Sequence, residues 1–99
     1  MINECTQSSL ETIAWVGRTN FHATLIGRPT SGALGQAIRI PLWDNNYAFF
    51  SGIGLFSHDK TALQRKGILP DIEVFPTMDD VLAGRDEVLE TAIKYLNSN

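Results

Sequence analysis

Cysteine and histidine are scarce in this sequence, which has one cysteine (Cys5) and two histidines (His22 and His58) among 99 residues. A single cysteine cannot form an internal disulfide or a cysteine-based zinc site, and we expect its small side chain to be buried. The histidines stand far apart and outside any metal-ligand spacing. No apolar run reaches the roughly 20 residues of a membrane-spanning helix. We therefore expect no bound metal, no cofactor and no membrane span.

Positive charge is also sparse. Eight Lys and Arg residues oppose eleven Asp and Glu residues, which gives a net charge of −3. The basic residues are scattered from Arg18 to Lys94 and form no patch. Because binding to a phosphate backbone needs clustered Lys and Arg, a nucleic-acid partner is excluded. A hydrophobic content of 43% in so short a chain indicates one small globular domain.

Hydrophobic periodicity predicts a mixed α/β fold. Ser8 and Glu11 form a capping-box pattern at the start of the first helix. The residues Asp44-Asn45-Asn46 are typical of a tight turn, because Asn and Asp tolerate positive φ. The expected elements, in chain order, are a helix over 8–19, a strand over 23–26, a hairpin over 37–55, a strand over 72–75, a helical turn over 79–83 and a C-terminal helix over 86–96.

Ser8 is the strongest candidate for chemistry, because free main-chain N–H groups at a helix N-terminus can stabilise an oxyanion. The N–H group of Ser9 is the natural donor. The alternative is that Ser8 only caps the helix, which is the commoner role of such a serine. A nucleophilic serine also needs a base, and we expect both histidines in exposed turns. The segment Gly27–Gly32 begins like a phosphate-binding loop but lacks the following Lys and Ser or Thr, so a nucleotide site is excluded.

The segment Asn3–Glu11, which reads Asn-Glu-Cys-Thr-Gln-Ser-Ser-Leu-Glu, resembles the nucleophile segment of the C-terminal processing (tail-specific) serine peptidases. Those enzymes have Asn-Glu-Gly-Ser/Thr-Ala-Ser-Ala-Ser-Glu there. The Gly-Ile-x-Pro-Asp-Ile pattern at 67–72 is the most specific further match. Other similar stretches follow in the family's order at 23–27, 29–32, 51–54, 64–74 and 84–89. The resemblance covers nearly the whole chain, but only the C-terminal half of the family's catalytic core.

This resemblance implies a partial α/β core of the ClpP/crotonase-like type, with strands, packed helices and a C-terminal helix. It identifies residues 1–99 as the C-terminal part of a serine peptidase catalytic domain, with the upstream half of the core and a PDZ domain outside the chain. Only Met1 and Ile2 remain for the strand expected before the first helix, which fits that interpretation. By position, Ser8 matches the nucleophile, and the N–H group of Ser9 matches one donor of the oxyanion hole.

One departure from the family pattern concerns the general base. Many members use a lysine within Gly-Lys-Gly, and Ala33 stands at that position here. Because alanine cannot take a proton, the chain is most similar to the lysine-less, tricorn-like branch, whose base is a histidine from an upstream segment. That branch also uses an acidic residue shortly before the Gly-x-x-Pro-Asp stretch. Gln64 stands near that place and is a possible supporting residue.

The resemblance implies that Ser8 attacks a peptide carbonyl and forms an acyl-enzyme, with a base supplied from outside this chain. We expect peptide or protein substrates, an inactive isolated chain and an extracytoplasmic location. Uncovered apolar faces and sheet edges predict self-association. The main alternative is a non-catalytic ligand-binding module of the same fold, similar to the retinoid-binding proteins, which aromatic residues such as Trp43 and Phe49 would suit. A crotonase-like acyl-CoA enzyme is a further alternative.

Overall fold

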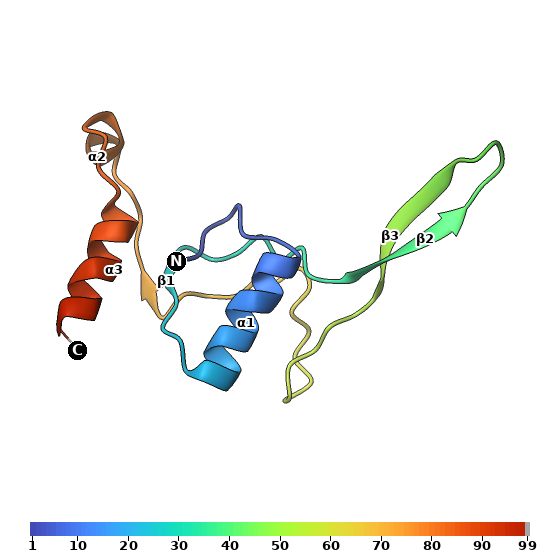
Figure 1. Ribbon diagram of the computed structural model, residues 1–99, viewed down its shortest axis with the longest axis horizontal. Coiled ribbons are helices and arrows are strands. Elements are labelled where there is room, and N and C mark those ends of the chain that lie inside the picture. The colour runs from blue at the N-terminus through green and yellow to red at the C-terminus, as the bar shows by residue number, and fades with distance from the viewer. Residues whose placement is uncertain (99) are drawn as a thin grey trace.

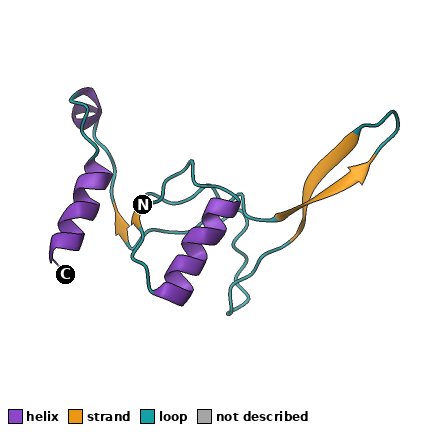
Figure 2. Cartoon of the chain, viewed as in Figure 1, coloured by secondary structure: helices purple, strands orange, loops and turns teal. Residues whose placement is uncertain are grey.

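The computed structural model describes residues 1–98 as three helices and two small two-stranded sheets (Figure 1). Helices α1 and α3 lie on either side of the short parallel sheet, and a hairpin extends away beyond α1. Figure 2 shows how much of the remaining chain is loop. The elements are α1 (Ser9–Phe21), β1 (Ile26–Gly27), β2 (Gln36–Pro41), β3 (Tyr47–Ile53), β4 (Ile72–Glu73), α2 (Met78–Leu82) and α3 (Glu87–Ser98).

The parallel sheet brings the N-terminal residues close to the segment around residue 72. Strands β1 and β4 pair in parallel, with Ile26 opposite Ile72, and Ile2 forms a one-residue parallel bridge to Gly27 on the other side of β1. The N–H group of Ile2 donates to the carbonyl of Ile26 at 2.9 Å. Gly27 has a φ of 130°, and a Cβ there would lie 2.1 Å from the carbonyl oxygen of Ile2. Glycine is therefore required for this close approach.

A small apolar core lies between α1 and the parallel sheet. Ile2, Ala14, Leu25 and Ile68 are buried together, and Trp15 packs against them. α1 presents Ala14 to this core, whereas Ile13 and Phe21, which line a groove on its outer side, are exposed at 67% and 76%. The core thus holds the inner face of α1 and leaves its outer apolar face uncovered within residues 1–98.

The hairpin β2–β3 projects from this core as an arm (Figures 1 and 2). Its strands pair antiparallel, with Ile38 opposite Phe50. Asp44 and Asn45 in the connecting turn have φ angles of 54° and 59°. Positive φ at both central residues matches the twist of a tight hairpin, and Asp and Asn tolerate it well. The predicted turn is therefore confirmed.

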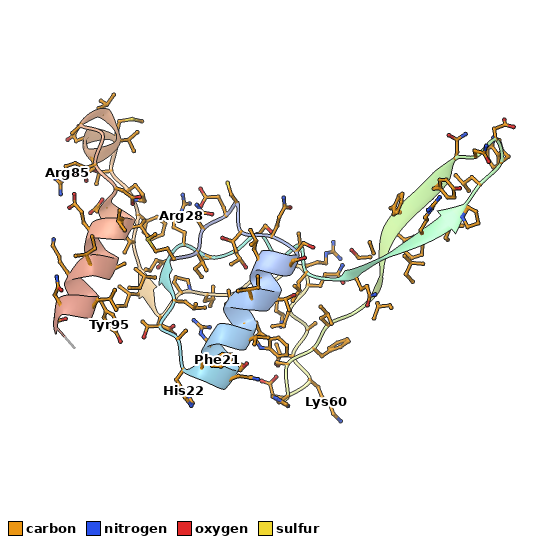
Figure 3. All side chains as sticks on the ribbon, in the orientation of Figure 1. Phe21, His22, Arg28, Lys60, Arg85 and Tyr95 are labelled. Atoms are coloured by element: carbon orange, nitrogen blue, oxygen red, sulfur yellow. The ribbon has the colours of Figure 1, made fainter. Side chains whose placement is uncertain are left out.

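The C-terminal segment is organised by local capping. Thr77 caps α2 by accepting a hydrogen bond from the N–H group of Asp80 at 3.2 Å. Arg85 then pairs with Asp80 at 2.9 Å and with Glu90 at 2.7 Å, and so joins α2 to α3. The hydroxyl groups of Tyr95 and Thr24 lie 2.9 Å apart and connect α3 to the residues before β1. Figure 3 shows Arg85 and Tyr95 at opposite ends of α3.

The molecule is extended for its length. Its radius of gyration is 17.0 Å and its principal extents are 55 × 35 × 17 Å, whereas a compact domain of this size has a radius of gyration of about 13 Å. Many large apolar side chains are accordingly exposed, including Leu10, Trp43 and Phe49. Within residues 1–98, none of the helices combines the length and apolar character needed to cross a membrane.

The expected α/β fold is confirmed, with shifts at the element boundaries. α1 runs to Phe21, two residues beyond the predicted end. The predicted strand over 23–26 is wrong before Ile26, because the N–H group of Ala23 bonds back to Gly17 and closes the end of α1. The strand predicted over 72–75 is reduced to Ile72–Glu73, the two residues that pair with β1.

Candidate active site

Ser8 occupies a strained turn at the start of α1. As the N-cap residue it has a φ of 55° and a ψ of −120°, whereas an ordinary N-cap residue is extended. A left-handed φ costs a residue with a side chain about 1–3 kcal/mol, and such strain persists where the surroundings hold it in place. The N–H group of Glu11 donates to the main-chain carbonyl of Ser8 at 3.0 Å, so it does not depend on the serine hydroxyl. Ser8 is exposed.

A cavity of about 290 Å³ opens beside this turn. It is lined by Ser8 and Ser9 on one side and by the loop that leads into β2 on the other. The N–H group of Ser9 is the first of α1, and among residues 1–98 no acceptor takes it. Such a donor can stabilise negative charge beside the Ser8 hydroxyl. The residues lining the cavity are Ser8, Ser9, Thr12, Leu34, Gly35, Gln36, Ala37 and Leu55.

Glu11 is the residue whose importance the capping pattern understated. Its side chain is fully buried, with 0% exposure. Its Oε2 accepts the N–H group of Ser8 at 3.0 Å, which confirms one arm of the predicted capping box. Its Oε1 accepts the Thr30 hydroxyl at 2.5 Å and the N–H group of Gly32 at 2.9 Å. A buried carboxylate needs such partners, since an unpaired one is costly to desolvate.

Two glycine-containing loops meet backbone to backbone next to Glu11. Gly32 and Gly67 both have a φ of 71°. A Cβ on Gly32 would lie 2.9 Å from the nitrogen of Gly67, and a Cβ on Gly67 would lie 2.4 Å from the carbonyl oxygen of Thr30. The N–H group of Ile68 also donates to the Thr30 hydroxyl at 2.7 Å. Gly67 and Ile68, the first two residues of the Gly-Ile-x-Pro-Asp-Ile pattern, therefore pack against the loop that contacts Glu11.

The two histidines lie in exposed turns, as expected. His22 ends α1 in a left-handed conformation, and thirteen helical residues separate it from Ser8 by roughly 20 Å. Figure 3 shows His22 at the end of α1 and Lys60, two residues beyond His58, at the tip of its own loop. Neither histidine lines the cavity beside Ser8. Residues 1–98 also contain no group of three or more His, Cys, Asp or Glu side chains that could hold a metal ion.

Gln64 and Gln36 occupy different positions relative to the cavity. Gln64 is half-buried and does not line it, but a Cβ on Gly35 would lie 3.3 Å from Gln64 Nε2. Gln36, which the sequence reasoning did not single out, lines the cavity together with Ser8. Ala33 is exposed in the loop that leads into β2. The residues lining the cavity therefore bring hydroxyl and amide groups to Ser8 but no titratable side chain.

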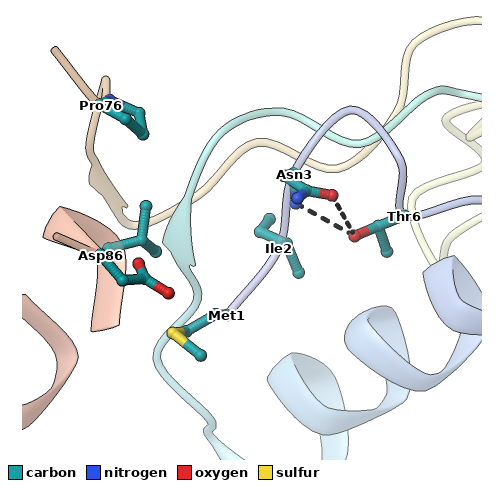
Figure 4. Close-up of a pocket in the computed structure, with 7 residues that line it drawn as sticks. Met1, Ile2, Asn3, Thr6, Pro76 and Asp86 are labelled. Carbon is teal, nitrogen blue, oxygen red and sulfur yellow. Dashed lines mark hydrogen bonds between the residues drawn. The ribbon is translucent and has the colours of Figure 1, made fainter. Parts of the chain in front are cut away.

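The residues before Ser8 form a polar turn. The N–H group of Asn3 donates to the Thr6 hydroxyl at 3.0 Å, and the N–H group of Cys5 donates to Asn3 Oδ1 at 3.0 Å. Cys5 is exposed, so the expectation of a buried thiol is wrong: the turn directs it outward. Figure 4 shows Asn3 and Thr6 at a second cavity of about 280 Å³, near Pro76 and Asp86. The Asp86 carboxylate accepts the N–H group of Leu89 there, which caps α3.

Asp71, from the Gly-Ile-x-Pro-Asp-Ile pattern, anchors the parallel sheet. Its Oδ2 accepts the N–H group of Leu25 at 2.7 Å, and its Oδ1 pairs with Arg18 of α1 at 3.0 Å. Arg18 also donates to the carbonyl of Leu69 at 2.5 Å. The hydrogen bond from Leu25, reinforced by Arg18, lowers the pKa of the Asp71 carboxyl below its ordinary value. This residue thus positions α1 and has no contact with the cavity beside Ser8.

Solved structures with the same fold include two peptidases. A candidate peptidase from Parabacteroides merdae is 29% identical, with a TM-score of 0.81 over 95% of this chain and 30% of that chain. The tricorn protease is 23% identical, with a TM-score of 0.83 over 95% of this chain and 9% of that chain. This chain therefore spans less than a third of either protein. No curated protein matches it.

Comparison with family models gives the identification. The model described as Peptidase family S41 matches residues 1–74. The match includes the turn at Ser8, the buried Glu11, the loop at Gly32 and the Gly-Ile-x-Pro-Asp-Ile pattern, which are the parts that the structure packs together. Because it extends over well more than half of the sequence, the chain belongs to peptidase family S41.

Proposed function

We propose that this chain is the C-terminal part of a serine peptidase catalytic domain and that Ser8 is its nucleophile. The observation that carries the proposal is the conformation of Ser8, an exposed serine held at a φ of 55°. It directly precedes the N–H group of Ser9, which has no acceptor in the part of the chain that the structure describes. Strained turns of this kind concentrate at functional sites. The substrates are peptides or proteins, as membership of a peptidase family implies.

In the proposed reaction, the Ser8 hydroxyl oxygen bonds to the carbonyl carbon of a peptide, and its proton passes to a general base. The carbonyl oxygen gains the negative charge, which the N–H group of Ser9 stabilises. The C–N bond then breaks, the base returns the proton to the leaving amine, and an acyl group remains on Ser8. A water molecule attacks this ester, again with help from the base, and releases the acid.

The general base comes from outside this chain in our proposal. Ala33 cannot take a proton, and the residues that line the cavity have no titratable side chain. His22 lies at the far end of α1. These observations favour the lysine-less, tricorn-like arrangement, in which a histidine of another segment approaches Ser8. The isolated chain is accordingly expected to hydrolyse no peptide.

The proposal is tested by labelling the complete peptidase with a fluorophosphonate and measuring its intact mass. We expect one phosphonyl adduct, which forms as the Ser8 oxygen bonds to phosphorus and fluoride leaves. Ser8→Ala should abolish the adduct and peptide hydrolysis. Ser98→Ala is the matched control, because within residues 1–98 its exposed hydroxyl bonds only to the Tyr95 carbonyl at the end of α3. Peptide hydrolysis that survives Ser8→Ala would exclude Ser8 as the nucleophile.

A non-catalytic binding module is the second candidate, and one observation favours it. The cavity beside Ser8 has Leu34, Ala37 and Leu55 among its lining residues and no charged group, which suits an apolar ligand. If the complete protein binds retinol in a fluorescence titration and Ser8 takes up no phosphonyl group, the binding module is the better account.

A further inference from the structure

Glu11 is a buried acidic residue to which the reaction above gives no role. It is fully buried, yet it lies only three residues after Ser8 on the first turn of α1. Three hydrogen bonds from two separate parts of the chain converge on its carboxylate. A helix cap alone would need only one of them. The other two bonds therefore indicate a second role.

Each oxygen of the Glu11 carboxylate holds a different segment. Oε2 accepts the N–H group of Ser8 at 3.0 Å, so it fixes the main chain of the residue that has left-handed φ. Oε1 accepts the Thr30 hydroxyl and the N–H group of Gly32, which lie 19 and 21 residues further along the chain. The carboxylate is thus a rigid link between the turn at Ser8 and the loop at Gly32.

The loop at Gly32 is itself braced, so it gives Glu11 a fixed support. The N–H group of Arg65 donates to the carbonyl of Gly32 at 2.7 Å, and that of Ile68 donates to the Thr30 hydroxyl at 2.7 Å. On the other side, the N–H group of Ser31 donates to the carbonyl of Thr6 at 3.0 Å, two residues before Ser8. The turn at Ser8 is therefore held from both ends through this loop.

We propose that Glu11 is a positioning residue, whose carboxylate holds the Ser8 turn against the loop at Gly32 and so aims the Ser8 hydroxyl at the substrate carbonyl. The inference rests on the proposed function of Ser8. Glu11 takes no part in proton transfer, because both of its oxygens are occupied by hydrogen bonds inside the protein. Its contribution is to hold a geometry that the free turn would leave, and reaction rates depend steeply on such placement.

Glu11→Gln separates the two halves of the link. Glutamine retains one acceptor oxygen, which is best used on the two donors Thr30 and Gly32. Its NH₂ group then faces the N–H group of Ser8, and two donors oppose each other. Thr30→Val is the matched variant, since it removes the hydroxyl from Oε1 and leaves the contact between Oε2 and Ser8. Thr30→Val also removes the acceptor of the Ile68 N–H group. Both variants therefore lose buried hydrogen bonds, but only Glu11→Gln loosens Ser8.

The experiment measures fluorophosphonate labelling of Ser8 and peptide hydrolysis in the complete peptidase. We expect Glu11→Gln to lower the labelling rate and kcat by about 10²-fold, with KM little changed. Thr30→Val should give a clearly smaller loss. Amide hydrogen exchange supplies an independent readout: the N–H group of Ser8 should lose protection in Glu11→Gln and retain it in Thr30→Val.

Folded Glu11→Gln enzyme that is labelled at the wild-type rate would overturn the inference while leaving Ser8 as the nucleophile. If Glu11→Gln does not fold, Glu11→Asp takes its place, because the shorter side chain retains the charge but cannot reach both segments. Equal labelling rates in Glu11→Asp and Thr30→Val would likewise overturn it. Wild-type enzyme without labelling would refute the proposed function itself, and the inference with it.

Discussion

The side chain of Asp71 holds three segments of this chain together. Its carboxylate accepts the N–H group of Leu25 and pairs with Arg18, and it thereby joins the segment before β4 to the segment before β1 and to α1. The pKa of Asp71 is lowered from 3.8, first by the bond from Leu25 and then by Arg18. A carboxyl group whose pKa is lower in the folded state stabilises that state only while it is ionised.

This contribution gives a pH-dependent prediction. The stabilisation by Asp71 is complete above the ordinary pKa of 3.8 and is lost as the pH falls through the lower pKa of the folded state. Asp71→Asn should lower the free energy of unfolding by about 1 kcal/mol at pH 7, because half-exposed ion pairs contribute little and a hydrogen bond about that much. Denaturation midpoints between neutral pH and pH 3 should fall less steeply in Asp71→Asn than in the wild type. Glu73→Gln, which changes an exposed side chain on β4, is the control. Equal acid sensitivity of the wild type and Asp71→Asn would contradict the prediction.

The candidate site was partly predictable at the level of single residues. Ser8 and Ser9 stand out because a serine before an apolar periodic run marks a helix N-terminus, and capping is a local effect. The left-handed φ of Ser8 and the burial of Glu11 have no such local signal. Both depend on Thr30 and Gly32, whose place in space is set by a loop 19 to 21 residues away. Gln36 was missed because its position beside Ser8 depends on how that loop enters β2.

The elements show the same division between local and long-range effects. The helix α1 and the turn at Asp44-Asn45 were predicted well, because periodicity, caps and tolerance of positive φ are properties of short segments. The parallel strands were predicted too long. β1 and β4 extend only as far as they pair with each other, at Ile26–Gly27 and Ile72–Glu73, and that pairing joins residues far apart in the sequence.

The N-terminus of α1 gives a prediction that belongs to the element as a whole. Ser9 is the first helical residue, a position at which proline is well tolerated because the N–H group has no partner within the helix. Ser9→Pro should therefore leave α1 intact while it removes the proposed oxyanion donor. Loss of one such donor lowers kcat by about 10²–10³-fold.

Kinetic assays of the complete peptidase would check this expectation, with circular dichroism to verify the fold. Ser9→Ala is the matched variant, since it loses the hydroxyl but retains the N–H group and should cost much less activity than proline. Equal kcat values for Ser9→Pro and Ser9→Ala in folded enzyme would show that this N–H group does not stabilise the transition state.

At the scale of the whole molecule, the uncovered apolar surface is the dominant feature. A groove of about 290 Å³ on the outer side of α1 is lined by Thr12, Ile13, Val16, Gly17 and Phe21. The hairpin arm adds exposed aromatic side chains, with Trp43 and Phe49 at 77% and 67%. Contiguous apolar patches are uncommon on monomeric soluble proteins and mark surfaces that become covered. In the proposed peptidase, other parts of the catalytic domain would cover them.

The isolated chain should therefore self-associate. We expect its mean mass in light scattering to rise with concentration, because burial of apolar surface drives association at about 25 cal/mol per Å². Ile13→Glu places a charge in the middle of the outer face of α1 and should lower that mass at equal concentration. Asn20→Glu adds the same charge at an exposed polar position of the same helix and should leave the association largely intact. A monomer at every concentration would show that these faces do not pair in solution. Equal masses for the two variants would show that the association uses another surface, and the hairpin arm would be the next one to test.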